Sequence, residues 1–139
     1  LLYKFISRFS FWPLGSYKNK RSFCSLDNLL FIIKELIEQV EIPSGIYNIC
    51  DDEPISTNEL ISLIAKSQNK KIWIFSFPKL LVNKIAKLGD IMNLPLNSNR
   101  LEKLTDSYLL SNSKIKNAIK KHLPVNSKQG LLKTLETFK

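Results

Sequence analysis

The sequence predicts a helix-rich α/β chain with too few strands for a complete doubly wound sheet. Apolar residues recur every three or four positions in several segments, which is typical of amphipathic helices. A few short apolar runs between polar turns indicate strands. Apolar residues make up 44% of the 139 residues, so the chain can form one folded domain with a real core.

In the first half of the chain, we expect a helix over residues 2–9, a strand over 21–25, a helix over 27–40 and a strand over 46–50. Asp27 suits the start of the second helix, because a carboxylate can cap free N–H groups and favours the positive end of the helix dipole. The strand over 46–50 is apolar at nearly every position, as expected of a strand covered on both faces.

In the second half, Ser56 and Glu59 form the pattern of a capping box, which predicts a helix from this point. A strand over residues 72–77 and a helix after Pro78 follow, with Leu81, Val82, Ile85, Leu88 and Met92 expected on its inner face. We then expect a polar joint over 93–99, an extended segment over 105–110, a helix over 113–123 and a last helix over 127–138.

The net charge of +9 is the strongest deviation in composition. It is compatible with nucleic-acid binding, with attraction to an anionic membrane, or with a site for an anionic small molecule. Lysine dominates and only Arg8, Arg21 and Arg100 are arginines, so a solvated lysine surface is the simplest interpretation. No segment approaches the roughly 20 apolar residues of a membrane span, and Lys4 interrupts the opening apolar run. We therefore expect a cytoplasmic protein without a membrane span.

The sequence offers little for metal or redox chemistry. Cys24 and Cys50 lack the close spacing or histidine neighbours of a metal site, so we expect buried free thiols within strands. The acidic run over residues 51–53 suggests a cation site or, more simply, turn and capping residues. Both tryptophans, Trp12 and Trp73, are expected to pack in the interior.

A nicotinamide cofactor needs clustered glycines after a first strand, so that the backbone can approach the pyrophosphate. The glycines at positions 15, 45, 89 and 130 are not clustered. No tyrosine is followed four positions later by a lysine. We therefore expect neither cofactor binding by that mode nor catalytic residues in this chain.

Two segments, residues 19–29 (NKRSFCSLDNL) and 45–56 (GIYNICDDEPIS), resemble the C-terminal, substrate-binding half of the NAD-dependent epimerase/dehydratase family. These are extended short-chain dehydrogenase/reductases that act on nucleotide sugars, such as UDP-sugar 4-epimerases. The resemblance implies that residues 1–139 form a single substrate-binding portion of an extended Rossmann-type enzyme. The N-terminal portion, which would bind NAD and carry the catalytic residues, is then absent, and the isolated chain is expected to be inactive. The resemblance is also compatible with a homodimer of the complete protein.

The resemblance also implies a set of substrate-binding residues. It places the backbone of Trp12 and Leu14 beside the uracil of a UDP-hexose, and Arg21 on the diphosphate. Arg100 and Lys103 are candidates for a second phosphate contact. Read without the resemblance, Arg21 is a surface arginine paired with Asp27. The tail after residue 123 departs from the family pattern.

An alternative function is a basic, non-enzymatic module that binds nucleic acid or an acidic partner. Its support is the net charge and a lysine-rich helix that contains Lys114, Lys116, Lys120 and Lys121. A remnant without activity is a third possibility. The resemblance favours a nucleotide-sugar substrate as the partner over nucleic acid.

Overall fold

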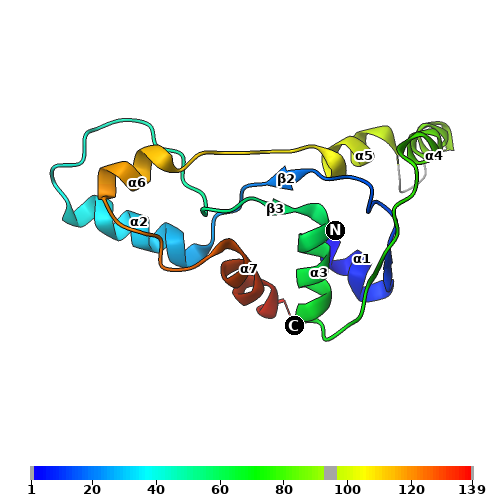
Figure 1. Cartoon of the computed structure of the whole chain (residues 1–139), viewed down its shortest axis with the longest axis horizontal. Coiled ribbons are helices and arrows are strands. Elements are labelled where there is room, and N and C mark those ends of the chain that lie inside the picture. Colours follow the sequence, from blue (N-terminus) through cyan, green and yellow to red (C-terminus); the bar gives the residue numbers. More distant parts are fainter. Residues whose placement is uncertain (1, 93–96, 139) are drawn as a thin grey trace. The chain divides into compact units, whose positions relative to one another are not determined.

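The computed structural model describes residues 2–92 and 97–138 (Figure 1). The chain divides into two compact units, which are described separately here. Unit 1 comprises the residues up to Lys20 and Ser56–Ser107, and unit 2 comprises Arg21–Ile55 and the residues from Tyr108 onward.

Helices dominate the structure and the strands are short. Unit 1 contains α1 (Leu2–Arg8), β1 (Phe11–Trp12), α3 (Thr57–Ser67), β4 (Trp73–Ile74), α4 (Lys79–Met92) and α5 (Ser98–Thr105). Unit 2 contains α2 (Leu26–Glu38), α6 (Ser113–Ile119) and α7 (Ser127–Glu136). The chain passes from one unit to the other within β2 (Lys20–Arg21) and β3 (Ile55–Ser56), which form a two-stranded sheet. The expected helix-rich α/β class is confirmed.

In unit 1, β1 and β4 pair in parallel, with Phe11 opposite Trp73. Trp12 is only 3% exposed, and its ring meets the ring of Phe5 edge-on at 5.9 Å. The chain then turns at Gly15, where a Cβ atom would lie 2.8 Å from the carbonyl oxygen of Phe75. Only glycine therefore allows the backbone to pass this close to the strand.

The start of α3 has the predicted capping box. The Ser56 hydroxyl accepts a hydrogen bond from the backbone N–H of Glu59 at 3.1 Å. The Glu59 carboxylate accepts in return from the backbone N–H of Ser56 at 3.0 Å. Ile61 and Ile64 lie on the buried face of the same helix, as the periodicity predicts.

Two buried or half-buried amides attach the loop over residues 15–19 to the helices of unit 1. Asn19 Nδ2 donates to the Thr57 hydroxyl at 2.7 Å, and to the carbonyl oxygens of Leu104 and Asp106 at 3.1 Å each. The side-chain amide of Asn58 donates to the carbonyl oxygen of Gly15 at 3.0 Å. These bonds hold the loop against the start of α3 and the end of α5.

In unit 2, α2 packs against α6 around Ile32, Ile115 and Ile119. A buried carboxylate, Asp51, lies at the start of α2. It accepts from the backbone N–H and the hydroxyl of Ser25, each at 3.0 Å, and from Asn28 Nδ2 at 2.6 Å.

The same contacts continue into the C-terminal part of unit 2. Asn28 Nδ2 also donates to the carbonyl oxygen of Val125 at 2.9 Å, and Asn28 Oδ1 accepts from the Val125 N–H at 3.1 Å. Asn28 thereby connects the first turn of α2 to the segment that leads into α7.

Several predicted strands are shorter than expected or absent. Residues 46–50 form no strand among the described residues, and Ile46 is 88% exposed. The prediction of a strand covered on both faces was therefore wrong. The strand over 21–25 is confined to Arg21, and the strand over 72–77 to Trp73–Ile74. Extended segments need a neighbouring ladder to become strands, and the described residues supply only short ones. Cys24 is exposed, not buried, and Trp73 is also exposed, whereas Cys50 and Trp12 are buried.

The helices differ from the predictions mainly at their ends and faces. The predicted joint over 93–99 lies partly outside the described residues, and α5 begins at Ser98, where no helix was predicted. Ser25, not Asp27, occupies the N-cap position of α2, and the lysine-rich α6 ends at Ile119, well before residue 123. On α4, Val82 is buried, but the other four residues predicted to face inward are exposed.

Replacing Ser56 by alanine should lower the free energy of unfolding by about 1 kcal/mol, because the N–H of Glu59 loses its acceptor. Urea denaturation measures this change. Ser62→Ala is the matched control, since Ser62 lies on the exposed side of the same helix and should change stability little. Equal effects of the two variants would contradict the capping role.

Asp51→Asn should lower the free energy of unfolding by about 1–3 kcal/mol, because Ser25 and Asn28 then donate to a neutral acceptor and the amide nitrogen that replaces one carboxylate oxygen cannot accept. The change keeps the shape of the side chain, so any loss comes from the hydrogen bonds. Glu38→Gln removes the charge from an exposed pair with Lys34 and should have almost no effect. Denaturation curves for Asp51→Asn that match those of Glu38→Gln would refute the prediction.

Candidate functional site

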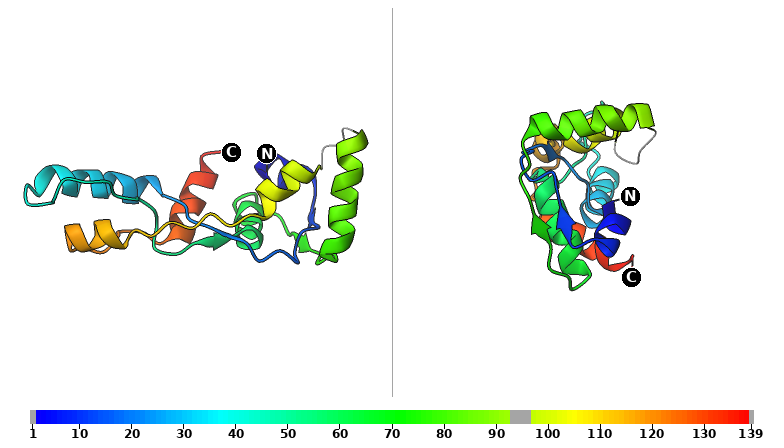
Figure 2. Two further views of the ribbon diagram at one scale, coloured as in Figure 1. Left: turned by 90° about the horizontal axis from the view of Figure 1, so that it is seen from above. Right: turned by 90° about the vertical axis from the view of Figure 1, so that its right-hand side faces the viewer.

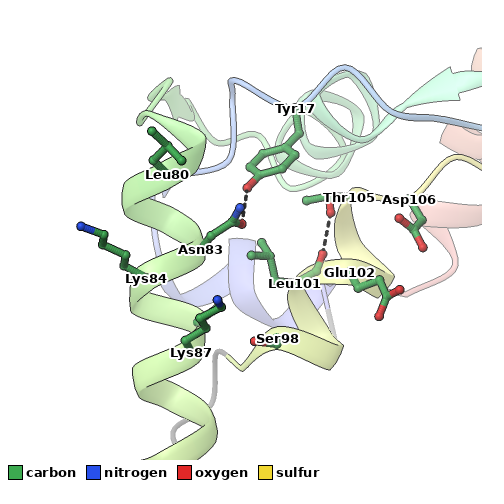
Figure 3. Close-up of a pocket in the computed structure, with 11 residues that line it drawn as sticks. Tyr17, Leu80, Asn83, Lys84, Lys87, Ser98, Leu101, Glu102, Thr105 and Asp106 are labelled. Carbon is green, nitrogen blue, oxygen red and sulfur yellow. Dashed lines mark hydrogen bonds between the residues drawn. The ribbon is translucent and has the colours of Figure 1, made fainter.

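Unit 1 contains a pocket of about 570 Å³ between α4, α5 and the loop that carries Tyr17 (Figure 3). The apolar residues of its lining are Leu80, Ala86 and Leu101. The remaining lining side chains are polar or charged: Tyr17, Asn83, Lys84, Lys87, Ser98, Glu102, Thr105 and Asp106.

Tyr17 forms the upper edge of this pocket. Its hydroxyl lies 3.3 Å from Asn83 Oδ1, to which it donates, and the ammonium of Lys79 lies over its ring at 5.3 Å. Burial raises the pKa of Tyr17, so the phenol stays protonated and remains a donor at neutral pH. Lys87 turns toward the gap between α4 and α5, whereas Lys84 extends away from it (Figure 3).

The start of α5 is attached firmly to α4. Asn97 Oδ1 accepts from the backbone N–H of Arg100 at 2.9 Å and caps the helix. Asp90 of α4 accepts from the Ser98 N–H at 2.9 Å and from the Ser98 hydroxyl. These hydrogen bonds from Ser98 lower the pKa of Asp90, so its carboxylate is ionised. The pocket therefore combines a fixed wall with hydroxyl, ammonium and carboxylate groups, which suits a hydroxylated or partly anionic ligand.

Trp12 and Leu14 lie in unit 1, and both are buried. The carbonyl oxygen of Trp12 accepts from the Phe75 N–H at 2.8 Å, and that of Leu14 accepts from the Tyr17 N–H at 3.2 Å. Leu14 also lines a second, apolar pocket of about 240 Å³ with Pro13, Phe77, Leu81, Val82 and Ile85. The contact of these two backbones with a uracil stays a prediction.

Arg100 and Lys103 lie three positions apart on α5, so they share a face of that helix. They belong to the same unit as Trp12 and Leu14, but they are not among the residues that line the pocket between α4 and α5. Sequence analysis missed Tyr17, Lys87 and Glu102. The spacing of Asn83 and Lys87 on one helix face was a signal, but their apposition to α5 follows only from tertiary structure.

Arg21 belongs to unit 2, where it lies beside Tyr108. Its guanidinium lies over the tyrosine ring, 5.2 Å from the centroid, and the neighbouring Ser22 N–H donates to the Tyr108 carbonyl at 2.8 Å. Stacking of this kind holds a guanidinium plane in one orientation. Asp27, the partner expected from the simpler interpretation, accepts from Lys133 Nζ at 2.8 Å through both oxygens.

The lysines near α6 mostly have partners within unit 2. Lys116 lies 2.7 Å from Asp52, and Lys121 lies 2.7 Å from the buried carboxylate of Glu35. Lys114 donates to the carbonyl oxygen of Ile46 at 2.8 Å and lies over the ring of Tyr47. A lysine held in this way is less available to phosphate groups of a nucleic acid.

Metal and thiol chemistry find little support among the described residues. No group of three or more His, Cys, Asp or Glu side chains there is arranged to hold a metal ion. Partial desolvation raises the pKa of the Cys24 thiol and burial raises that of Cys50, and the charge of Asp51 acts in the same direction on both, so little reactive thiolate is present. Asp51 serves instead as an acceptor for Ser25 and Asn28. No helix in the described part of the chain is long and apolar enough to cross a membrane.

The glycines do not fit a dinucleotide cofactor. Gly89 and Gly130 lie within helices α4 and α7, and Gly45 lies in an irregular segment. Gly15 follows β1, but it leads into a loop and not into the N-terminus of a helix. A pyrophosphate site of the glycine-rich type needs a strand that runs directly into a helix.

No family model and no curated protein sequence matches this chain. Solved structures do match it. The crystal structure of a "putative epimerase" from Burkholderia cenocepacia J2315 aligns with 99% of this chain at a TM-score of 0.57 and 17% identity. The structure of RMD from Pseudomonas aeruginosa, complexed with NADPH, aligns with 99% at a TM-score of 0.56 and 15% identity.

The chain spans 41% and 40% of the lengths of these two proteins. At this level of identity the likeness shows the fold alone: nearly the whole chain has the architecture of a part of each of these two proteins.

The pair formed by Glu35 and Lys121 predicts a pH dependence of stability. The hydrogen bond from Lys121 lowers the pKa of Glu35 in the folded state. The stabilisation is therefore present above the pKa of an unfolded glutamate, about 4.3, and is lost as the pH falls through the lower folded-state pKa. Lys121→Ala should reduce stability at pH 7, and the difference from the parent protein should shrink in acid.

Urea denaturation at a series of pH values measures that difference. Lys66→Ala, which removes an exposed lysine from α3, is the control and should show no such pH dependence. A Lys121→Ala effect that is constant down to pH 3 would contradict the assigned role of the pair.

Proposed function

We propose that this chain is the nucleotide-sugar-binding portion of an NAD-dependent epimerase/dehydratase, with a UDP-hexose as substrate. The observation that carries the proposal is the fold match over 99% of the chain, combined with the motif that contains Arg21. One matched protein is described as an epimerase and the other was solved with NADPH, which is consistent with this class.

In this proposal, Arg21 binds the diphosphate. A guanidinium can donate two parallel hydrogen bonds to phosphate oxygens, and a charge-assisted pair of this kind is strong. The ring of Tyr108 would keep the guanidinium plane oriented before the ligand arrives. A pre-oriented side chain loses less conformational entropy when the ligand binds.

The backbones of Trp12 and Leu14 are proposed to lie beside the uracil, and Arg100 or Lys103 to contribute a second phosphate contact. The buried side chain of Trp12 and the hydrogen bonds of the 15–19 loop support a rigid backbone here. Rigid backbone groups select a base by the geometry of their donors and acceptors.

The cofactor and the catalytic residues are proposed to belong to a portion of the enzyme outside this chain. The matched structures are more than twice as long, and the glycines of this chain do not fit a dinucleotide. Helix α2 adds support. Its inner side packs on α6, yet Leu30, Ile33 and Ile37 on its other sides are exposed. A helix that is apolar on nearly all sides is normally buried between two partners.

The alternative of a nucleic-acid-binding module rests on the net charge of +9. The internal partners of Lys114, Lys116 and Lys121 make it the weaker proposal. The two functions differ in their response to salt, because binding through many phosphate contacts weakens steeply as salt rises.

The test is calorimetric titration of the full-length protein with UDP. Arg21→Ala should weaken binding by about 10- to 100-fold, the usual range for the loss of charge-assisted hydrogen bonds. Arg21→Lys should recover only part of the affinity, because an ammonium lacks the planar fork. Arg8→Ala, a change of another exposed arginine at the end of α1, is the matched control.

Unchanged UDP affinity in Arg21→Ala would overturn the assignment of Arg21. Absence of UDP binding together with salt-sensitive binding to DNA or RNA would instead favour the basic module.

A further inference from the structure

Helix α4 presents a broad apolar surface within unit 1. Six of its side chains are between 47% and 82% exposed, and we call them the α4 apolar face: Leu80, Leu81, Ile85, Leu88, Ile91 and Met92. Val82, Ala86 and Gly89 lie on the opposite, buried side. Figure 2 shows the backbone of α4 as one continuous helix. An exposed apolar stripe of this length marks an interaction surface.

Aromatic side chains extend this surface beyond the helix. Phe75 and Phe77, just before α4, are 48% and 44% exposed, and their ring centroids are 6.4 Å apart. Phe77 lines the smaller apolar pocket together with Leu81 and Ile85, so the aromatic pair is continuous with the helix face.

The charges of α4 are predominantly basic. The helix carries Lys79, Lys84 and Lys87 against a single acidic residue, Asp90, which is occupied by its hydrogen bonds from Ser98. Lys84 is four positions from both Leu80 and Leu88, so it rises from within the α4 apolar face. A lysine in this position can lay its aliphatic stem on an apolar surface while its ammonium reaches an anionic layer.

Comparison with helix α2 helps to decide whether protein or lipid covers the α4 apolar face. It also exposes apolar side chains, but its charged residues are Asp27, Lys34, Glu35 and Glu38, which leaves it acidic. An apolar helix with few free cations suits the interior of a protein. An apolar helix flanked by lysines and aromatic rings suits the boundary between lipid headgroups and acyl chains.

We propose that α4 is an interfacial helix that binds the surface of an anionic lipid membrane. The α4 apolar face and Phe77 enter the acyl boundary, and Lys84, which lies within that face, contacts headgroup phosphates. The helix lies in the plane of the membrane and does not span it. This inference is independent of the substrate and reaction proposed above.

Co-sedimentation of the full-length protein with vesicles tests the proposal. We expect binding to vesicles of phosphatidylcholine mixed with phosphatidylglycerol, and much weaker binding to phosphatidylcholine alone. Leu88→Gln combined with Ile91→Gln should abolish binding. Lys84→Gln should weaken it by about fivefold, the usual contribution of one lysine near an anionic surface.

Matched controls keep the outcome interpretable. Ile33→Gln combined with Ile37→Gln removes exposed apolar residues from α2, and Lys66→Gln removes an exposed lysine from α3. None of these should change vesicle binding, and circular dichroism verifies that every variant is folded. UDP binding by Leu88→Gln/Ile91→Gln should be unchanged, because neither residue lines the pocket between α4 and α5.

Three results would overturn the proposal. Equal loss of vesicle binding in the α4 and control variants would show that binding is not specific to α4. Dimers that dissociate on Leu88→Gln/Ile91→Gln would show that a second copy covers this face. Failure of the folded full-length protein to bind anionic vesicles would show that lipid does not cover this face.

Discussion

The buried carboxylate of Asp51 is the constraint on which unit 2 depends. It accepts hydrogen bonds from the backbone and hydroxyl of Ser25 and from Asn28, which in turn bonds to Val125. A Cβ atom on Gly130 would lie 2.3 Å from the Cβ of Ser25, so α7 also approaches this point closely. A single buried charge, compensated by several donors, therefore connects the start of α2 with the C-terminal helix.

Unit 1 uses a neutral amide in a similar way. Its strands are only two residues long, so they supply few ladder hydrogen bonds. Asn19 compensates by bonding to Thr57, Leu104 and Asp106, which lie far apart in the sequence. The loop that carries Tyr17 is held as a result, and one edge of the pocket between α4 and α5 is rigid without being part of a sheet.

Helices α2 and α4 both expose apolar side chains, but their charged residues differ, and this difference is hidden in the net charge of the whole chain. The acidic residues of α2 and its contact with α6 favour burial against further protein, whereas the lysines of α4 favour a lipid surface. Much of the remaining positive charge is compensated locally, as at Lys116 and Lys121. The net charge of +9 is thus better explained by separate local roles than by one nucleic-acid surface.

The sequence by itself determined the helix-rich α/β class and the capping box at Ser56, because these follow from local periodicity and from side chains a few residues apart. Only the tertiary structure decided that residues 46–50 form no strand, that α5 begins at Ser98 and that most of the apolar residues of α4 face outward. The pocket beside Tyr17 is also a feature that only the tertiary structure decided. Each of these depends on which distant segment lies alongside, and strand pairing and helix burial are properties of the partner as much as of the segment itself.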